Sequence, residues 1–193
     1  AGTLGVEFLS HDVSSAEAWE AVVSDVVSRH GRIDVLVNNA GILRGARLVN
    51  TSDDIWDQTV AINQTGVFYG MRAVAPQMIE QDSGSIVNIS SVAGLEATFA
   101  SMAYGATKWA VRGMSKIAAL ELGRHNVRVN SIHPGLINTD MTSEFDKDRM
   151  VRAIPLGREA DASEVAAVAL FLASDDSSYC SGQEFTVDGG MHR

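Results

Sequence analysis

The chain has 193 residues, of which 46% are hydrophobic, and a formal net charge of −9; a chain of this length can build one domain with a sizeable core. The negative charge and the lack of any Lys- or Arg-rich run argue against nucleic acid, and the longest apolar stretch, Val165–Ala173, is far below the about 20 residues that span a membrane. A single cysteine, Cys180, leaves no internal disulfide and favours a reducing cytoplasm, while five scattered histidines predict no metal site.

Strand-like and helical runs alternate from the beginning of the chain. Val6–Leu9 predicts a first strand, and Ser14 or Ser15 is suited to cap the helix that follows. Gly31 is a typical helix stop, and Ile33–Val37 predicts the next strand. The helix between them carries one apolar face, made of Ala18, Trp19, Val22, Val23, Val26 and Val27.

The rest of the chain continues this alternation. A long helical region is predicted from about Ser52 to Gln81, although Gly66, Gly70 and Pro76 weaken its regularity. The later predicted elements are a strand at Ser85–Ile89, a helix at about Met102–Gly123, a strand at Val127–Ile132, a helix that ends at Ala173 and begins with a capping box of Asp161 and Glu164, and a strand at Glu184–Val187.

Strands and helices in this order are typical of an α/β fold. Nearly continuous apolar strands predict a parallel sheet with helices on both faces. Right-handed crossovers then favour a doubly wound, Rossmann-like sheet, while periodicity alone leaves a flavodoxin-like sheet open. The chain contains no internal repeat and no convincing linker, so residues 1–193 are expected to form a single domain.

Three polar residues are spaced so that they could act together in catalysis. Ser91 follows the strand Ser85–Ile89, where open α/β sheets bind ligands, and Tyr104 and Lys108 face the same way near a helix start. Bringing a phenol pKa from about 10 to about 7 needs about 4 kcal/mol, and an ammonium ~4 Å away supplies that amount at an effective dielectric of about 20. Tyr104 can then act as general acid or base, tuned by Lys108, while Ser91 donates to the substrate oxygen.

The alternative interpretation is a surface Tyr–Lys pair and an ordinary serine after a strand. Tyr-x-x-x-Lys alone favours that alternative, but Ser91, thirteen residues before Tyr104, changes the balance. This spacing resembles the catalytic serine, tyrosine and lysine of the short-chain dehydrogenase/reductase family. The resemblance implies an oxidoreductase that uses NAD or NADP. A serine hydrolase built on Ser91 is disfavoured because no G-x-S-x-G elbow is present.

Further motifs extend the resemblance over nearly the whole chain. The turn Asn38-Asn39-Ala40-Gly41 matches a family segment, which implies cofactor contacts at Asn39, Ala40 and Gly41 and a role for Asn38 in tying strand ends together. A plain turn after a strand explains the glycine but not the paired asparagines. Asn63 matches the family's fourth catalytic residue, which holds a water for proton relay, with a helix kink as the alternative.

Two other segments are assigned to the cofactor by the same resemblance. Asp12 and Val13 match a contact with adenine, although a helix-capping role explains Asp12 almost as well. The segment after Val127–Ile132 matches the clamp on the nicotinamide amide, where the Ile137 backbone and the Thr139 hydroxyl would make the contacts. The cofactor-binding residues inferred from these two segments and the catalytic group are Asp12, Val13, Tyr104, Lys108, Pro134, Gly135, Ile137 and Thr139.

The beginning of the chain departs from the family pattern. The family opens with a strand and a glycine-rich turn that places pyrophosphate on a helix N-terminus, and no such cluster precedes Val6. The first two strand–helix units, about 60 residues, are therefore expected to be missing from an N-terminally incomplete domain. The residue that reads the ribose 2′ position would be missing with them, so the residues leave NAD and NADP undistinguished.

This departure leads to two expectations for the chain as printed. The other four strands should form one parallel sheet, and the strand at Val6–Leu9 should be detached or displaced. The 193-residue chain alone should bind NAD or NADP poorly and show no useful dehydrogenase activity, because the amides that hold the pyrophosphate would be absent.

The sequence indicates the substrate class less strongly than it indicates the catalytic residues. Four apolar residues between Ser91 and Tyr104 suggest a pocket wall, with packing in the core or at a subunit interface as an equal alternative: Leu95, Ala97, Phe99 and Met102. Two runs, at 105–113 and 129–135, look similar to bacterial hydroxysteroid dehydrogenases of the 3α/20β type, a resemblance that favours NAD. Residues 140–156 are expected to form a mobile lid of mixed charge.

The leading hypothesis is an oxidoreductase for a secondary alcohol or ketone of hydrophobic or steroid-like shape. The alternatives are a 3-oxoacyl thioester reductase of the same family, and an inactive fragment that acts only as a structural or interaction module. By resemblance, the helices at Ser52–Gln81 and Met102–Gly123 pair across a two-fold axis in a homodimer or homotetramer. Ala103, Trp109 and Ala110 are candidates for burial against a partner or the sheet.

Overall fold

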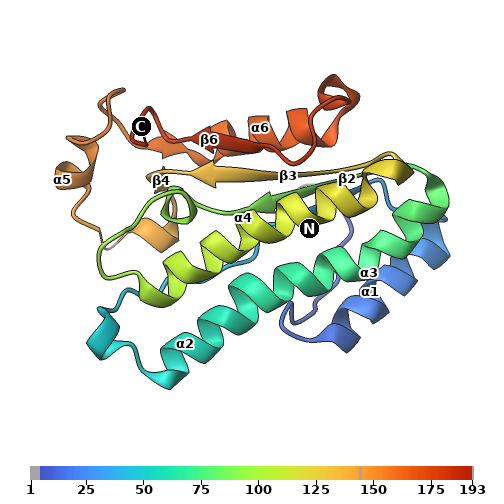
Figure 1. Cartoon of the computed structure of the whole chain (residues 1–193), viewed down its shortest axis with the longest axis horizontal. Coiled ribbons are helices and arrows are strands. Elements are labelled where there is room, and N and C mark those ends of the chain that lie inside the picture. Colours follow the sequence, from blue (N-terminus) through green and yellow to red (C-terminus); the bar gives the residue numbers. More distant parts are fainter. Residues whose placement is uncertain (1–4, 144, 193) are drawn as a thin grey trace.

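A parallel sheet forms the centre of the computed structural model, which describes residues 5–143 and 145–192. The strand order is β1 (Val35–Asn38), β2 (Gly84–Ile89), β3 (Val127–Pro134) and β6 (Glu184–Val187), and all neighbours run parallel. A smaller parallel pair joins β4 (Ile137–Asn138) to β5 (Ala160–Asp161). The expected α/β fold and the expected single sheet of four strands are both confirmed (Figure 1).

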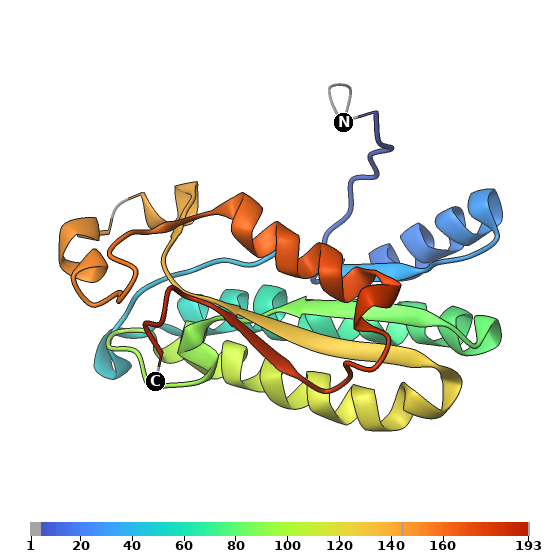
Figure 2. The same cartoon turned by 90° about the horizontal axis from the view of Figure 1, so that it is seen from above.

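Helices cover both faces of this sheet. The helices are α1 (Ala16–His30), α2 (Asp53–Val60), α3 (Gly66–Gln81), α4 (Met102–Leu122), α5 (Lys147–Val151) and α6 (Ala162–Ala173). Figure 2 shows α6 on one side of the sheet and α3 with α4 on the other. Neighbouring residues of β2 serve the two faces in turn, since Ile86 packs under α3 and Val87 packs under α6.

The helix boundaries follow the capping signals of the sequence. The Ser15 hydroxyl accepts from the amide of Ala18 at 3.1 Å, and Gly31 closes α1 in the left-handed conformation. At α6, Asp161 and Glu164 form the predicted capping box. On the apolar face of α1 only Trp19 is fully buried, because this helix lies at the outer edge of the α3 layer.

The long helical region is continuous but not uniform. Between α2 and α3 the chain makes one π-helical turn over Ala61–Thr65, which contains the buried Asn63. Gly70 does not break α3; a Cβ at this position would lie 2.5 Å from the Asn38 side-chain oxygen, so only glycine lets α3 approach the end of β1 this closely.

The prediction of a strand at Val6–Leu9 is wrong. These residues pair with no strand among the described residues, and the segment runs away from the sheet (Figure 2). Phe8 is 74% exposed. The cause is the lack of a neighbour, because among the strands that the structure describes β1 is the last on this side of the sheet and pairs with β2 alone. The expectation that this segment is displaced from the sheet is confirmed.

Candidate active site

Ser91 lies where β2 leaves the sheet, at the carboxyl end of the strands. It begins a short 3₁₀ turn, Val92–Gly94, and its hydroxyl accepts from the amide of Ala93 at 3.1 Å. The turn packs tightly on α4, since a Cβ on Gly94 would lie 2.7 Å from the Lys108 carbonyl oxygen. The hydroxyl of Ser90 donates to the same carbonyl at 2.9 Å. The turn that carries Ser91 is therefore fixed against the helix that carries Lys108.

Tyr104 and Lys108 lie one turn apart on α4, and both are buried. The Ser91 side chain acts to lower the pKa of the Tyr104 phenol, so the two groups face each other. The Lys108 ammonium lies 5.5 Å from the centre of the Tyr104 ring and donates to the Ile89 carbonyl at 2.8 Å. The structure thus brings together the three residues that the sequence singles out.

The protonation of this group differs from the sequence expectation. Burial raises the pKa of Tyr104, and the smaller effect of the Ser91 side chain acts to lower it. Burial also lowers the pKa of Lys108 to about 8. The expected lowering of the phenol pKa by Lys108 is not found, and desolvation of the ring is the largest influence on this pKa. At neutral pH the Tyr104 phenol therefore carries its proton, as a general acid must.

The Asn63 side chain connects the π-helical turn to the loop that follows β1. Its side-chain oxygen accepts from the Ile42 amide and its amide group donates to the Ile42 carbonyl, both at 2.8 Å. The same amide group reaches the Thr107 hydroxyl at 3.4 Å. A Cβ on Gly41 would lie 3.4 Å from the Asn63 oxygen and 3.7 Å from the Lys108 nitrogen. Asn63 therefore holds the Gly41–Ile42 segment beside Lys108, at an irregular point in the helical region.

The Asn38 side chain ties neighbouring strands together. It donates to the Asn88 side-chain oxygen at 2.8 Å, and Asn88 donates in turn to the Ser115 hydroxyl on α4 at 2.9 Å. All three side chains are buried. Asn39 and Ala40 follow Asn38 at the same strand end and are exposed. This chain of hydrogen bonds links β1, β2 and α4 below the candidate site.

The segment after β3 lies at the same edge of the sheet. Gly135 donates to the Val187 carbonyl at 2.9 Å, and a Cβ on Gly135 would come within 2.7 Å of the Asp188 side chain, so the loop passes close to the end of β6. Ile137 is buried and begins β4, whereas Thr139 is exposed. Pro134, at the end of β3, is partly exposed.

Asp12 and Val13 lie in the segment before α1, where Val13 contacts the beginning of α3. The Asp12 carboxylate accepts from the amide and the hydroxyl of Ser14 at 2.8 and 2.7 Å. This turn precedes α1, but Ser15 rather than Asp12 is the capping residue of the helix. The Val13 carbonyl accepts from the Trp19 indole at 3.0 Å and lies against Gly66, where a Cβ would come within 2.9 Å of it.

Comparison with known proteins decides the family. A family model described as enoyl-(acyl carrier protein) reductase matches residues 1–192. A 3-alpha-(or 20-beta)-hydroxysteroid dehydrogenase of Mycobacterium tuberculosis is 49% identical over 93% of this chain and 68% of its own length. A trans-4-hydroxycyclohexanecarboxylate dehydrogenase of Sinomonas cyclohexanicum is 45% identical over 95% of this chain and 70% of its own length. The chain belongs to the short-chain dehydrogenase/reductase family.

Solved structures of this family superpose closely on the chain. ElxO with NADP bound matches with a TM-score of 0.92 and 32% identity, over 96% of this chain and 77% of that one. A gluconate 5-dehydrogenase from Burkholderia cenocepacia, in complex with NADP and tartrate, matches with a TM-score of 0.91 and 35% identity, over 94% of this chain and 73% of that one. The Rossmann-like fold is confirmed by these neighbours.

The expected apolar wall between Ser91 and Tyr104 is only partly formed. Ala97 and Met102 line a pocket of about 320 Å³ with Trp109 of α4, but Ser91, Tyr104 and Lys108 are not among its lining residues. Phe99 lies outside the pocket and is 79% exposed, with the Arg47 guanidinium 5.1 Å above its ring. In the predicted lid, the structure describes a 3₁₀ turn at Asp140–Thr142 and helix α5; Glu144 lies outside the described residues.

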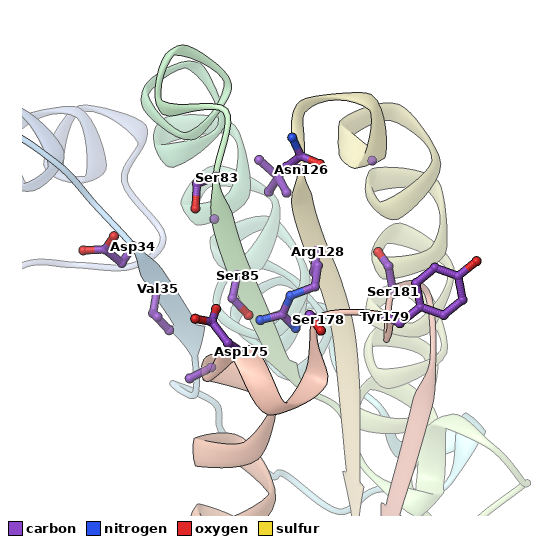
Figure 3. A pocket seen from close by; sticks show the side chains of 14 residues that line it. Asp34, Val35, Ser83, Ser85, Asn126, Arg128, Asp175, Ser178, Tyr179 and Ser181 are labelled. Carbon is purple, nitrogen blue, oxygen red and sulfur yellow. The ribbon is translucent and has the colours of Figure 1, made fainter.

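A larger pocket of about 570 Å³ lies at the opposite, amino end of the strands (Figure 3). Asp34, Ser85 and Arg128 are among the residues that line it. The Arg128 guanidinium donates to the Ser177 hydroxyl at 2.7 Å and to the Ser174 carbonyl at 3.1 Å, so it holds the turn after α6 in place. The pocket contains none of the residues that the sequence assigns to catalysis or cofactor binding.

Several buried polar residues near the site escape sequence reasoning. These are Asn88, Ser90, Thr107, Ser131 and His133. The only signal in the sequence is a polar residue inside a strand or on a helix face that is otherwise apolar, and this signal does not name the partner. Among the described residues, no group of three or more His, Cys, Asp or Glu side chains could hold a metal, and no helix is long and apolar enough to cross a membrane.

Proposed function

We propose that this protein reduces a ketone or oxidises a secondary alcohol of hydrophobic or steroid-like shape, with Tyr104 as general acid and base. The observation that carries the proposal is the buried group of Ser91, Tyr104 and Lys108 at the carboxyl end of the sheet, where the phenol keeps its proton at neutral pH. The 49% identity to a hydroxysteroid dehydrogenase supports the substrate class.

The residues at this edge fit the nicotinamide end of a dinucleotide. A lysine ammonium has three donors, and among the residues that the structure describes only the Ile89 carbonyl accepts from Lys108, at 2.8 Å. The remaining N–H groups suit ribose hydroxyls. Gly41 and Gly135 bring backbone close to the same edge. The residues proposed to hold the cofactor are those inferred from the sequence: Asp12, Val13, Asn39, Ala40, Gly41, Tyr104, Lys108, Pro134, Gly135, Ile137 and Thr139.

A bound nicotinamide would supply hydride to the carbonyl carbon, or accept it in the reverse direction. The Ser91 hydroxyl donates a hydrogen bond to the carbonyl oxygen as negative charge develops there. Tyr104 transfers its proton from the phenol oxygen to that oxygen, so that the product is a neutral alcohol and the tyrosine is left as a phenolate. The Lys108 ammonium beside the ring stabilises this phenolate.

Asn63 is proposed to support proton relay through its position. Its side chain fixes the Ile42 backbone and reaches the Thr107 hydroxyl, which in turn donates to the Tyr104 carbonyl at 2.8 Å. These contacts connect the π-helical turn to the backbone of the catalytic tyrosine. The family resemblance adds a water held by Asn63, which would return a proton to the site.

The cofactor is proposed to be NAD or NADP. The likeness to hydroxysteroid dehydrogenases favours NAD, whereas two of the similar solved structures are described with NADP. Titration of the full-length protein with each dinucleotide decides between them: preference for NAD supports the hydroxysteroid likeness, and preference for NADP contradicts this part of the proposal. The single cysteine favours a reducing compartment such as the cytoplasm.

A 3-oxoacyl thioester reductase is the second candidate. A 3-oxoacyl-[acyl-carrier-protein] reductase FabG of Thermotoga maritima is 46% identical over 93% of this chain and 74% of its own length. The discriminating experiment compares kcat/KM of the full-length protein for a steroid ketone and for an acetoacetyl thioester. A higher value for the ketone supports the first proposal, and a higher value for the thioester supports the second. Turnover of neither supports the structural or interaction module.

A homodimer or homotetramer is proposed for the assembled protein. The outer faces of α3 and α4 expose large apolar side chains, among them Phe68, Trp109 and Leu120. Ala103 is buried within the chain itself, whereas Trp109 remains 46% exposed and available to a partner. Sedimentation of the full-length protein at micromolar concentration should show a dimer or tetramer, and a monomer would contradict the proposal.

A further inference from the structure

The hydrogen-bond ladder between β2 and β3 stops at Ser90, one residue before Ser91. The Ser90 amide donates to the Ile132 carbonyl at 2.7 Å. The next donor in register would be the backbone nitrogen of Pro134, which carries no hydrogen. Strand β2 therefore loses its partner strand immediately before Ser91, and beyond this point the only backbone hydrogen bond to the Ser91 carbonyl among the described residues is local, from the Gly94 amide of the 3₁₀ turn at 2.9 Å.

The His133 side chain ties the same carbonyl to β3. Its ring is fully buried, with Nδ1 3.0 Å from the Ser91 carbonyl oxygen and Nε2 2.9 Å from the Ser131 hydroxyl. A carbonyl oxygen can only accept, so Nδ1 carries the hydrogen, and Nε2 of the neutral ring accepts from Ser131. Desolvation lowers the pKa of His133, in agreement with a neutral ring.

We propose that His133 is the positioning residue of Ser91. The carbonyl and the hydroxyl of Ser91 belong to the same residue, which is extended with φ −170° and ψ 162°. Fixing the carbonyl therefore fixes the Cα from which the hydroxyl extends, while the Ala93 amide holds the hydroxyl itself at 3.1 Å. This inference rests on the proposed function, and it gives His133 an effect on turnover rather than on stability alone.

Two variants of the full-length protein separate the effect of the Nδ1–H donor from the effect of the buried side chain itself. His133→Leu removes the N–H donor and keeps an apolar side chain, whereas His133→Asn keeps an N–H close to the position of Nδ1. His133→Leu should lower kcat for ketone reduction about 10- to 100-fold, the range expected for a misplaced catalytic group, and leave the KM for the dinucleotide within about twofold. His133→Asn should recover most of the loss.

A double-mutant cycle with Ser91→Ala tests whether His133 acts through Ser91. In the Ser91→Ala background, His133→Leu should change kcat by less than about threefold, since the hydroxyl that it positions is gone. Thermal unfolding of every variant accompanies the kinetics. If His133→Leu fails to fold, Ser131→Ala replaces it in the cycle, because it removes the hydroxyl that holds the ring in its tautomer. Equal losses in both Ser91 backgrounds would overturn the proposal.

Long-range ¹H–¹⁵N NMR of the histidine rings gives a readout that does not depend on activity. The proposal requires the hydrogen of His133 on Nδ1 at neutral pH, and the signal is assigned by its loss in His133→Asn. A protein that turns over no substrate but shows this tautomer would contradict the proposed function and leave the His133–Ser91 contact standing. A His133 ring with its hydrogen on Nε2 would overturn the positioning role, whatever the activity.

Discussion

The candidate active site and the β1 edge of the sheet differ in how firmly their residues are held in place. Around Ser91, Tyr104 and Lys108, polar groups are buried and joined by hydrogen bonds between α4, β2 and β3. At β1, Val37 is 44% exposed, and residues 5–9 lie in the open without a strand partner. The groups proposed for proton transfer are therefore already held in position, whereas no group placed in this way for the cofactor's phosphates is found among the described residues.

The largest effect expected from this difference is on dinucleotide affinity. The sequence contains no G-x-G-x-x-G, and no helix that the structure describes begins with a glycine-rich turn. The 193-residue chain should therefore bind NAD or NADP more weakly than about 1 mM, equivalent to about −4 kcal/mol. Calorimetry on the purified chain measures this, with Lys108→Met as a control for residual binding at the nicotinamide end. Micromolar affinity with measurable alcohol oxidation would refute it.

The next largest effect is a pH dependence of the free energy of unfolding caused by Lys108. Its pKa is lowered to about 8 in the folded chain from 10.5 by burial, so the unfolded chain binds more protons between these values. The free energy of unfolding should therefore rise with pH through this window. Below pH 8 the folded chain carries the full desolvation cost of the charged Lys108 ammonium. Relative to Lys108→Met, the wild-type chain should gain about 2–3 kcal/mol between pH 7 and pH 10.5.

Urea unfolding at a series of pH values gives this comparison. Subtracting the Lys108→Met curve removes the contribution of the other titrating groups, which both proteins share. Parallel curves through the window would show that Lys108 is not desolvated in the folded chain.

The smallest effect is expected when the same Val→Thr substitution is made in the buried part of the sheet and on the exposed strand β1. Val87→Thr places a hydroxyl in a fully buried position under α6 and should reduce the free energy of unfolding by about 1–2 kcal/mol. Val37→Thr, on the exposed β1, should change it by less than about 0.5 kcal/mol. Denaturant unfolding of both variants measures the difference, and equal losses would mean that β1 is covered in solution.

The sequence predicted most elements correctly where periodicity and capping agreed. Ser15, Gly31 and the Asp161–Glu164 box lie at helix ends as expected, because capping depends on residues a few positions apart. The strand at Val6–Leu9 failed for the opposite reason. A strand needs a partner that is distant in the sequence, and the composition of the segment itself says nothing about whether that partner is present.

In the site, spacing brought Ser91, Tyr104 and Lys108 together but did not predict their protonation. The pKa of Tyr104 depends on how deeply the ring is buried, and that depth follows from tertiary packing rather than from spacing in the sequence. His133 escaped sequence reasoning because its partner is a backbone carbonyl 42 residues away. Contacts of this kind follow from strand register, which only the folded sheet defines.

The central claim is that the Tyr104 phenol transfers the proton, and Tyr104→Phe tests it most directly. This substitution keeps the buried ring on α4 and removes only the hydroxyl. In the full-length protein kcat for ketone reduction should fall about 10²- to 10⁴-fold, with unchanged thermal unfolding. A variant that keeps more than about a tenth of the wild-type kcat, a barrier change below about 1.4 kcal/mol, would remove Tyr104 from the mechanism.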